Sequence, residues 1–210
     1  MKLLLQLTII AFIPLLTCAQ GVQAFDEIAP FSEGLAAVRK GNQWGFINTD
    51  GDLVIDFRPD LVWQKEAVKN MADVSGIAYP RFKNGRCVIQ KQLEEEKIAV
   101  YGFIDPSGKV VIEPEYLNLT EFEGDYALGI LFTKTFRGEN NFRLRIYDYK
   151  FSEVVLNTDG EIMRLIEQRN NIQMSVRRYT LPGLNTRILA KNLLAVRSPE
   201  NKWKLLKIAL

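Results

Sequence analysis

The sequence predicts a mainly β protein in which three-stranded antiparallel meanders repeat along the chain. Two observations support this fold class. The same order of short apolar segments and turn residues occurs at residues 31–59 and again at 82–114. Asp50-Gly51, a strong signal for a tight turn, separates two apolar segments of the first copy. One such unit cannot bury its apolar face alone, so we expect the units to stack as an open array or as a partial propeller-like ring.

Residues 1–19 have the three-part order of a secretory signal peptide. Lys2 precedes an almost wholly apolar stretch at 3–16, and Thr17 and Ala19 are small residues at positions −3 and −1 of a cleavage site. A buried core helix and a transmembrane anchor are the alternatives, but the stretch is too short to cross roughly 30 Å of hydrocarbon comfortably. We therefore expect export, with residues 20–210 forming a single β domain.

Cys18 offers a second outcome for this segment. Leu15-Leu16-Thr17-Cys18 resembles a bacterial lipobox, although Thr17 stands where Gly or Ala is usual. The mature chain would then begin at a lipidated Cys18 instead of Gln20, and this lipid would be its one link to a membrane. Either way, the protein is expected to be periplasmic, an outer-membrane-associated lipoprotein or secreted. No later stretch is long and apolar enough to span a bilayer.

The first unit, at residues 25–59, reads as three strands. Residues 35–38 form a short apolar strand, and a Gly-Asn turn leads into a return strand at 44–47. The Asp-Gly turn precedes a third strand at 53–55, and Pro59, which cannot donate to a ladder, ends it.

The linker at residues 60–80 breaks this pattern. Trp63, Ala67, Val68 and Met71 recur at helical spacing, so the sequence allows one short helix near residues 60–71. Trp63 lies outside the repeat and is the better candidate for a surface contact.

Three further units follow the linker, at approximately residues 82–116, 122–165 and 190–210. The position of Trp44 recurs at spacings of 57, 52 and 50 residues, as Tyr101, Glu153 and Trp203. Near-constant spacing indicates duplication. The third unit keeps an intact Asn-Thr-Asp-Gly tetrapeptide at 157–160 but has lost Trp-Gly. Alternating apolar residues at 142–147 and 172–177 predict two half-buried antiparallel strands.

The motifs Phe-x-x-Gly-Leu-Ala-x-Val, Trp-Gly-Phe-Ile-Asn and Asp-Gly-x-Leu-Val-Ile, all within residues 31–55, resemble the bacterial WG-repeat (WG-containing repeat) family. The resemblance is strong at 31–59, good at 82–116 and weak after Phe122. It implies a β-rich repeat protein, commonly exported or surface-associated, with no established general activity and no catalytic residues to carry over. The repeat positions with a structural role are Trp44, Gly45, Gly51, Tyr101, Gly102, Gly108, Gly160 and Trp203.

Composition excludes several function classes. The 210 residues contain no histidine, which removes Ser-His-Asp and Cys-His nucleophile systems and His-ligated zinc sites. The 27 Lys and Arg residues nearly balance the 25 Asp and Glu residues and form no run, so nucleic-acid binding is not expected. Cys18 and Cys87 do not make a disulfide framework. Cys87 aligns with a small strand position and should be a buried, inert thiol.

Three repeated aromatic residues have two interpretations. Trp44, Tyr101 and Trp203 could form a platform for sugars or peptides. Repeated aromatic residues usually fill repeated cores, however, and a core role is the favoured interpretation.

Two acidic segments also have simple structural explanations. Asn48, Asp50 and Asp52 resemble the start of a calcium loop, but the glycine and late glutamate of an EF-hand are missing, and a hairpin turn accounts for them. Residues 94–96, Glu-Glu-Glu, read as the solvated tip of a longer hairpin.

These observations favour a non-enzymatic binding or scaffolding protein of the bacterial cell envelope, with no catalytic, cofactor-binding or metal-binding residue. The expected partner is an envelope protein or a glycan. The alternative is an exported carboxylate-dependent hydrolase, or an accessory to one, acting on envelope polysaccharide. Such an enzyme needs two acids at a controlled separation, and nothing in the sequence marks such a pair.

Overall fold

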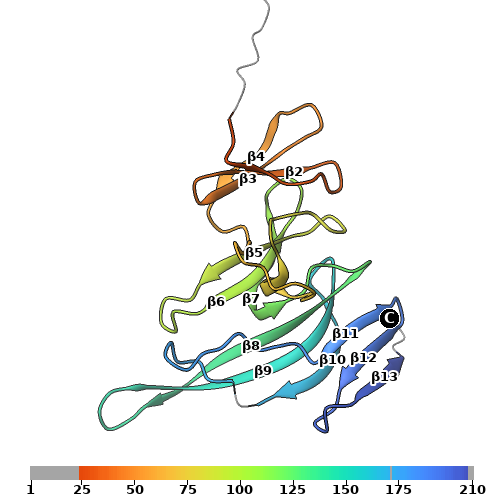
Figure 1. Cartoon of the computed structure of the whole chain (residues 1–210). Coiled ribbons are helices and arrows are strands. Elements are labelled where there is room, and N and C mark those ends of the chain that lie inside the picture. Colours follow the sequence, from red (N-terminus) through yellow and green to blue (C-terminus); the bar gives the residue numbers. More distant parts are fainter. Residues whose placement is uncertain (1–23, 171, 208–210) are drawn as a thin grey trace, which may run out of the picture.

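The computed structural model describes residues 24–170 and 172–207, which are almost entirely β. The expected signal peptide and Cys18 lie outside these residues. Three antiparallel sheets form, and within each sheet the strands are neighbours in the order of the chain (Figure 1). The mainly β fold class with repeated meanders is therefore confirmed. Within the described ranges, no helix has the length and apolar character needed to cross a membrane.

The first sheet corresponds to the first unit. Its strands are β1 (Glu27–Ile28), β2 (Ala36–Lys40), β3 (Gln43–Ile47) and β4 (Leu53–Arg58). The β2–β3 hairpin closes through a two-residue turn, because Lys40 pairs with Gln43. Gly41 in this turn has φ +58°, a conformation that glycine adopts without steric cost.

The second and third units share one six-stranded sheet. Its strands are β5 (Cys87–Gln92), β6 (Ala99–Ile104), β7 (Val110–Leu119), β8 (Tyr126–Glu139), β9 (Arg145–Asn157) and β10 (Ile162–Arg169). β7 pairs with β8, so the last strand of the second unit is the direct neighbour of the first strand of the third unit, and one sheet spans both units.

The fourth unit forms the third sheet. Its strands are β11 (Thr186–Ala190), β12 (Leu193–Arg197) and β13 (Trp203–Lys207). Figure 1 shows the units following one another from the first sheet to this last one, and the two end sheets do not meet. The described units therefore form an open array and not a closed ring.

Consecutive units stack through equivalent aromatic contacts. The rings of Phe46 and Phe82, from the first and second units, have centroids 4.8 Å apart and planes at 56°. Phe103 and Phe122, from the second and third units, have centroids 4.8 Å apart and planes at 57°. Two junctions with the same geometry are expected when one structural unit is repeated and each copy packs on its neighbour.

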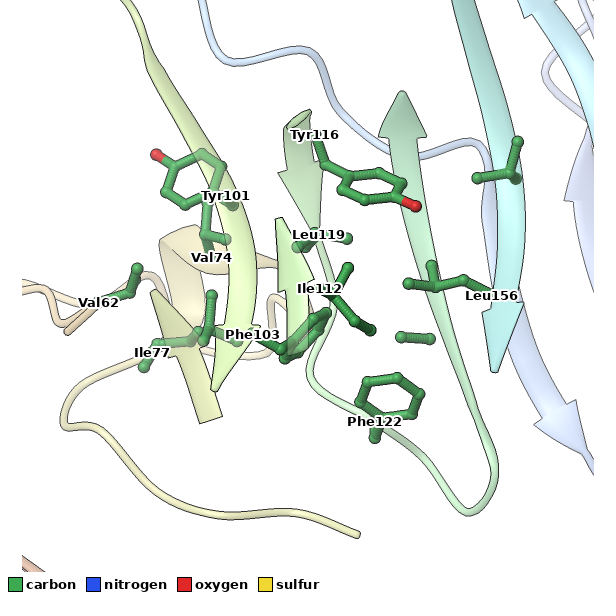
Figure 2. Packing of buried hydrophobic residues seen from close by; sticks show 13 residues of the cluster. Val62, Val74, Ile77, Tyr101, Phe103, Ile112, Tyr116, Leu119, Phe122 and Leu156 are labelled. Atoms are coloured by element: carbon green, nitrogen blue, oxygen red, sulfur yellow. The ribbon is translucent and has the colours of Figure 1, made fainter. Parts of the chain in front are cut away.

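Figure 2 shows the core at the second of these junctions. Phe103, Ile112 and Leu119 of the second unit lie against Phe122 and Leu156 of the third, and all five are buried. Removing this apolar surface from water stabilises the stack, since a fully buried side chain of this kind contributes about 1.5–3 kcal/mol.

The helix expected near residues 60–71 is absent. Residues 60–62 are extended along β5 instead: Val62 N donates to Val88 O at 3.2 Å, and Gln90 N donates to Asp60 O at 2.8 Å. Further along, Gln64 N and Val68 N donate to Ile77 O and Ser75 O, not to a helical partner. A segment that pairs with a strand cannot also be helical, so the tertiary contact overrides the apolar spacing. A 3₁₀ turn, η1 (Val74–Gly76), forms just after this segment.

The two strands expected at 142–147 and 172–177 also differ from the prediction. β9 begins at Arg145, and Phe142 lies in an exposed turn. Residues 172–177 form no strand, although Ile172 and Met174 pack against a buried cluster that includes Leu117 and Phe151. The alternation of apolar and polar residues correctly identified Ile172 and Met174 as side chains that face the sheet. The backbone of this segment, however, pairs with none of the described strands.

Candidate binding site

The repeated aromatic positions do not share one environment. Trp44 is 1% exposed and Tyr101 is also buried, so both residues fill the cores of their units. Trp203 is 45% exposed, and the core interpretation is wrong for it. Arg187 lies over its ring, with the guanidinium carbon 4.7 Å from the ring centroid. The difference arises because Trp63 from the linker covers Trp44, and no described segment takes that place over Trp203.

Trp63, which the sequence favours as a surface contact, is packed against other side chains on part of its ring. It packs edge-on against Trp44, with ring centroids 5.8 Å apart and planes at 67°. The guanidinium carbon of Arg39 lies 5.5 Å from the ring centroid of Trp63 and 5.8 Å from that of Trp44. Trp63 is half-buried as a result and belongs partly to the core of the first junction.

Gly45 in β3 and Gly102 in β6 lie where the backbone of the following strand, β4 or β7, comes close to the glycine Cα. A Cβ at Gly45 would be 2.7 Å from the carbonyl oxygen of Ile55, and one at Gly102 would be 2.3 Å from that of Ile112. β4 and β7 bulge at this point, so Gly45 and Gly102 have no partner on these strands, although each is paired with the strand before it. A backbone carbonyl occupies the space that a side chain would need, which explains the glycine after each aromatic residue.

The turns after β3, β6 and β9, one in each of the first three units, depend on a side-chain oxygen and a left-handed residue. Asn48 Oδ1 accepts hydrogen bonds from the backbone N–H groups of Asp50 at 3.0 Å and Asp52 at 2.9 Å. Asp105 and Asn157 do the same in the next two units. The fourth turn residue has φ of +86°, +83° and +84° at Gly51, Gly108 and Gly160, respectively. These oxygens already accept backbone hydrogen bonds, as a hairpin turn requires.

The acidic triplet is not simply a solvated tip. Glu94 and Glu95 are exposed, but Glu96 is buried. It accepts hydrogen bonds from Lys134 Nζ at 2.6 Å and from Tyr149 Oη at 2.9 Å. Burial opposes ionisation of Glu96, but these hydrogen bonds outweigh it and lower its pKa. The prediction is wrong for Glu96, which fastens this loop to β8 and β9.

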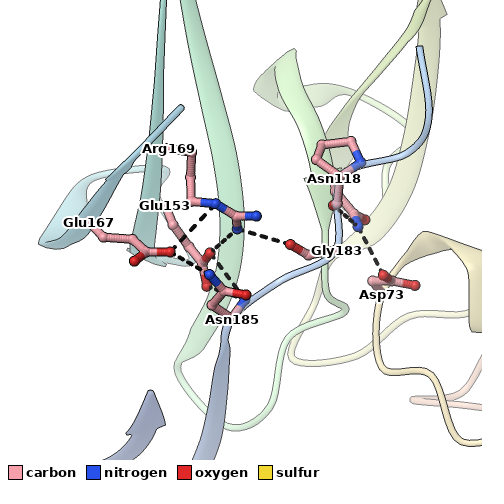
Figure 3. Close-up of polar contacts among 8 residues, drawn as sticks. Asp73, Asn118, Glu153, Glu167, Arg169, Gly183 and Asn185 are labelled. Atoms are coloured by element: carbon pink, nitrogen blue, oxygen red, sulfur yellow. Dashed lines mark hydrogen bonds and ion pairs between the residues drawn. The ribbon is translucent and has the colours of Figure 1, made fainter. Parts of the chain in front are cut away.

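Glu153 occupies the Trp position of the third unit and is fully buried (Figure 3). Arg169 Nη1 donates to it at 2.6 Å, and the backbone N–H of Asn185 donates to both carboxylate oxygens at 2.9 and 3.1 Å. A buried carboxylate needs such partners. They tie the segment that precedes β11 to strand β9. Sequence reasoning missed this network, although a charged residue at a repeated core position was an available signal.

A cavity of about 510 Å³ lies where the linker, the second and third units and β11 meet. Its volume is typical of a ligand cleft. Its walls come from residues 70–73, 81, 83, 120–123, 128, 184 and 186–188. None of these positions was a candidate in the sequence, because they come from four separate segments that only stacking of the units brings together.

Three charged side chains form one wall of the cavity. Arg81 Nε donates to Glu121 Oε1 at 2.6 Å, and Lys83 Nζ lies 2.9 Å from Glu121 Oε2. Burial opposes ionisation of Glu121, but the hydrogen bonds from Arg81 and Lys83 outweigh it and lower its pKa. Glu121 is therefore a fixed negative charge between two cations, which are partly exposed and have further N–H groups besides those bound to Glu121.

Two polar residues that line the cavity, Asp73 and Thr186, differ in their hydrogen bonding. Asn118 Nδ2 donates to Asp73 Oδ2 at 2.9 Å and to Pro182 O at 2.9 Å (Figure 3). Thr186, which lines the cavity, is buried, and its hydroxyl has no hydrogen-bond partner among the described residues. A buried hydroxyl without a partner is costly, so Thr186 is a candidate contact for a bound polar group.

Four carboxyl groups of the described residues have a clearly shifted pKa. Every carboxyl group with a clear pKa shift has a lowered pKa: Glu96, Asp105, Glu121 and Glu200. A glycosidase-type general acid instead needs a raised carboxyl pKa. Burial raises the pKa of the Cys87 thiol, so this buried cysteine stays protonated near neutral pH.

Comparison with known families identifies repeats in the chain. The profile of the WG containing repeat family matches residues 24–44, 44–58 and 101–128. The first two matches cover β1 to β4, and the third runs from the second unit into the start of the third, so the resemblance to WG repeats is confirmed in these segments. No curated protein and no solved structure matches the chain significantly.

Proposed function

We propose that this chain, which contains WG repeats, is a non-enzymatic binding or scaffolding protein of the bacterial cell envelope. Its binding site is the cavity between the second, third and fourth units. The WG-repeat match supports a repeat protein, and the N-terminal segment with its signal-peptide pattern supports export. The ligand is a polar, extended segment of an envelope protein or glycan.

The observation that carries this proposal is the state of Glu121. A carboxylate held ionised by Arg81 and Lys83 cannot supply a proton near neutral pH, but it holds both cations in place to receive acceptor groups. Phe122 and Leu128 add apolar lining, and Thr186 adds a hydroxyl with no partner. Apolar walls with a few convergent polar groups are the usual composition of a recognition site.

Closing the cavity without disturbing the core tests the proposal. Ala72 is exposed and lines the cavity, so Ala72→Trp should fill the entrance. Ala78, in the same linker, is also exposed but does not line the cavity, and Ala78→Trp is the matched control. The full exported chain and both variants are used to capture partners from envelope fractions, with the recovered protein or glycan identified and re-bound in purified form.

The expected result is a partner that binds the wild type and Ala78→Trp equally and Ala72→Trp at least about tenfold more weakly, a loss of about 1.4 kcal/mol. Equal binding of the partner by the wild type and both variants would show that the cavity is not the binding site. Cleavage of an envelope polysaccharide that stops when one carboxylate is replaced would contradict the non-enzymatic function and favour the hydrolase.

A further inference from the structure

The hairpin of β8 and β9 extends well beyond the sheet. β7 pairs with β8 no further than Leu131, and β10 pairs with β9 no further than Phe151. β8 and β9 nevertheless stay paired with each other out to Glu139 and Arg145. The outer half is therefore a two-stranded projection, which Figure 1 shows reaching away from the other strands. We call residues 134–150 the projecting hairpin.

Large apolar side chains are exposed at the outer part of the projecting hairpin. Phe142 is 83% exposed and Leu144 63% exposed, and Phe136 and Ile146 are also exposed. Soluble proteins rarely gather such residues at one place without a binding role.

These apolar residues lie on both faces of the projecting hairpin. Phe136 is paired with Tyr147, and their rings contact each other on one face with centroids 5.6 Å apart. Ile146, next to Tyr147 in β9, is opposite Gly138 and therefore points to the other face, because successive side chains in a strand alternate. A partner that docked on one face would leave the other face in water.

Most backbone N–H groups at the tip are paired within the turn. Asn140 Oδ1 accepts hydrogen bonds from the N–H groups of Phe142 at 2.8 Å and Leu144 at 3.0 Å. Asn140 N donates to Leu144 O, and Arg143 N donates to Asn140 O, both at 2.9 Å. With the N–H groups of residues 140 and 142–144 paired internally, the tip leaves water at a lower cost than an open loop would.

The same turn elsewhere in the chain carries different side chains. The turn that begins at Asn48 has the same pair of hydrogen bonds to its side-chain oxygen, but its residues 49–52 are Thr, Asp, Gly and Asp. Only the side chains differ, so turn geometry does not require Phe142 or Leu144. Their apolar character needs another explanation.

The projecting hairpin is also rich in basic residues. It contains five, Lys134, Arg137, Arg143, Arg145 and Lys150, against two acidic ones, Glu139 and Asp148. Lys134 is bound to Glu95 and Glu96, and Arg137 to Asp148, so the basic side chains that remain near the tip are Arg143 and Arg145, the latter 3.9 Å from Glu95. Residues 142–146 alternate apolar and arginine side chains, so each apolar residue that leaves water has a cation beside it.

We propose that the projecting hairpin inserts its tip into the interfacial layer of an anionic lipid membrane. Lipid that surrounds the tip covers both apolar faces at once, and the arginines contact anionic headgroups with their apolar stems buried beside the tip. Insertion reaches only the interfacial depth, because the outer backbone edges of a two-stranded hairpin are unpaired and cannot enter hydrocarbon. The proposal is independent of the ligand in the cavity.

A tryptophan at the tip reports insertion directly. Leu144→Trp is compared with Leu205→Trp, a change at a similarly exposed position, 69%, on β13 of the last unit. The full exported chain is mixed with vesicles of equal parts phosphatidylglycerol and phosphatidylcholine, with and without brominated acyl chains. We expect Leu144→Trp to gain blue-shifted emission that brominated lipid quenches, and Leu205→Trp to gain none. Any lipid on the N-terminus is common to both variants.

Partition measurements separate the apolar and charged contributions. Replacing Phe142 and Leu144 together by Ser should weaken binding to the anionic vesicles by about tenfold or more. Replacing Arg143 and Arg145 by Gln should weaken binding to the anionic vesicles but not to pure phosphatidylcholine, and added salt should have the same effect.

Fluorescence of the tip tryptophan that does not change when vesicles are added, or equal quenching of Leu144→Trp and Leu205→Trp, would overturn the proposal. If the tip crosslinks to an acidic protein and the vesicles change neither emission nor binding, the membrane proposal is wrong and the tip is a protein-binding site.

Discussion

Gly102→Ala should be among the most damaging single-methyl additions in this chain. The new Cβ would lie 2.3 Å from the carbonyl oxygen of Ile112, 2.7 Å from the backbone nitrogen of Pro114 and 2.8 Å from the carbonyl carbon of Glu113. All three contacts are with backbone, which cannot rotate away as a side chain can. Either β7 moves away from β6 at its bulge, or the methyl group is not accommodated.

The expected loss is about 3 kcal/mol, at the upper end of the range for overpacking. Gly45→Ala should lose less, about 1–2 kcal/mol, because its closest backbone contact, Ile55 O, is longer at 2.7 Å. Gly183→Ala is the matched control: it has no neighbour within 4 Å and no left-handed backbone, so it should be neutral or slightly stabilising. Urea unfolding followed by circular dichroism measures all three, and a slope of about 2 kcal/mol per M turns a 3 kcal/mol loss into a midpoint shift of about 1.5 M.

The refuting result is a midpoint for Gly102→Ala that matches Gly183→Ala. The third unit shows why the bulge, and not the aromatic neighbour, is held responsible. Val154 stands at the corresponding position and pairs directly with Leu165, because the register shifts fall on either side of this pair. A strand that pairs in ladder register leaves room for a side chain, whereas a strand that bulges over the same position does not.

Three further predictions concern the turns, the cavity wall and the N-terminus. Gly51→Ala should lower the free energy of unfolding by about 1 kcal/mol, since alanine is strained at φ +86°. Asp50→Asn should be nearly neutral, because asparagine also favours such turns. A calcium-dependent rise in melting temperature that Asp50→Asn abolishes would contradict both expectations. The folded-state pKa of Glu121 is lowered, so its contribution to stability is present above the unfolded pKa and lost as pH falls through the folded pKa. Wild type should therefore exceed Glu121→Gln in unfolding free energy near neutral pH and match it in acid, and a pH-independent difference would be inconsistent with the ion pairs. Mass analysis of the exported chain should find Gln20 or lipidated Cys18 first, and recovery of uncleaved chain in the cytoplasm would exclude export.

The first two units could be predicted well because their signals are local. A turn glycine, a short apolar strand and an aromatic residue followed by glycine each act over a few residues, and neighbours in the chain become neighbours in the sheet. The strands around Trp44 and Tyr101 therefore lie close to where the sequence places them. The family pattern adds the order of these elements and, with it, the stacking of units.

Predictions failed where the environment comes from another segment. Residues 60–62 are extended because β5 has an edge available, and Trp203 is exposed because nothing described covers it. Glu96 and Glu153 are buried because cations from other strands reach them. The cavity is a further case, since no single one of its wall segments has a distinctive composition.

The turn glycines that follow a junction are constrained by a second requirement besides their backbone angle. A Cβ at Gly108 would be 3.4 Å from Ile55 of the preceding unit, and one at Gly160 would be 3.2 Å from Ile112. Asparagine tolerates a left-handed turn but would bring its side chain against these isoleucines. Gly51 has no such neighbour. During divergence of the duplicated units, a new residue at the opening turn therefore has to satisfy only the backbone angle, while one at Gly108 would also contact Ile55 and one at Gly160 would also push Ile112 aside.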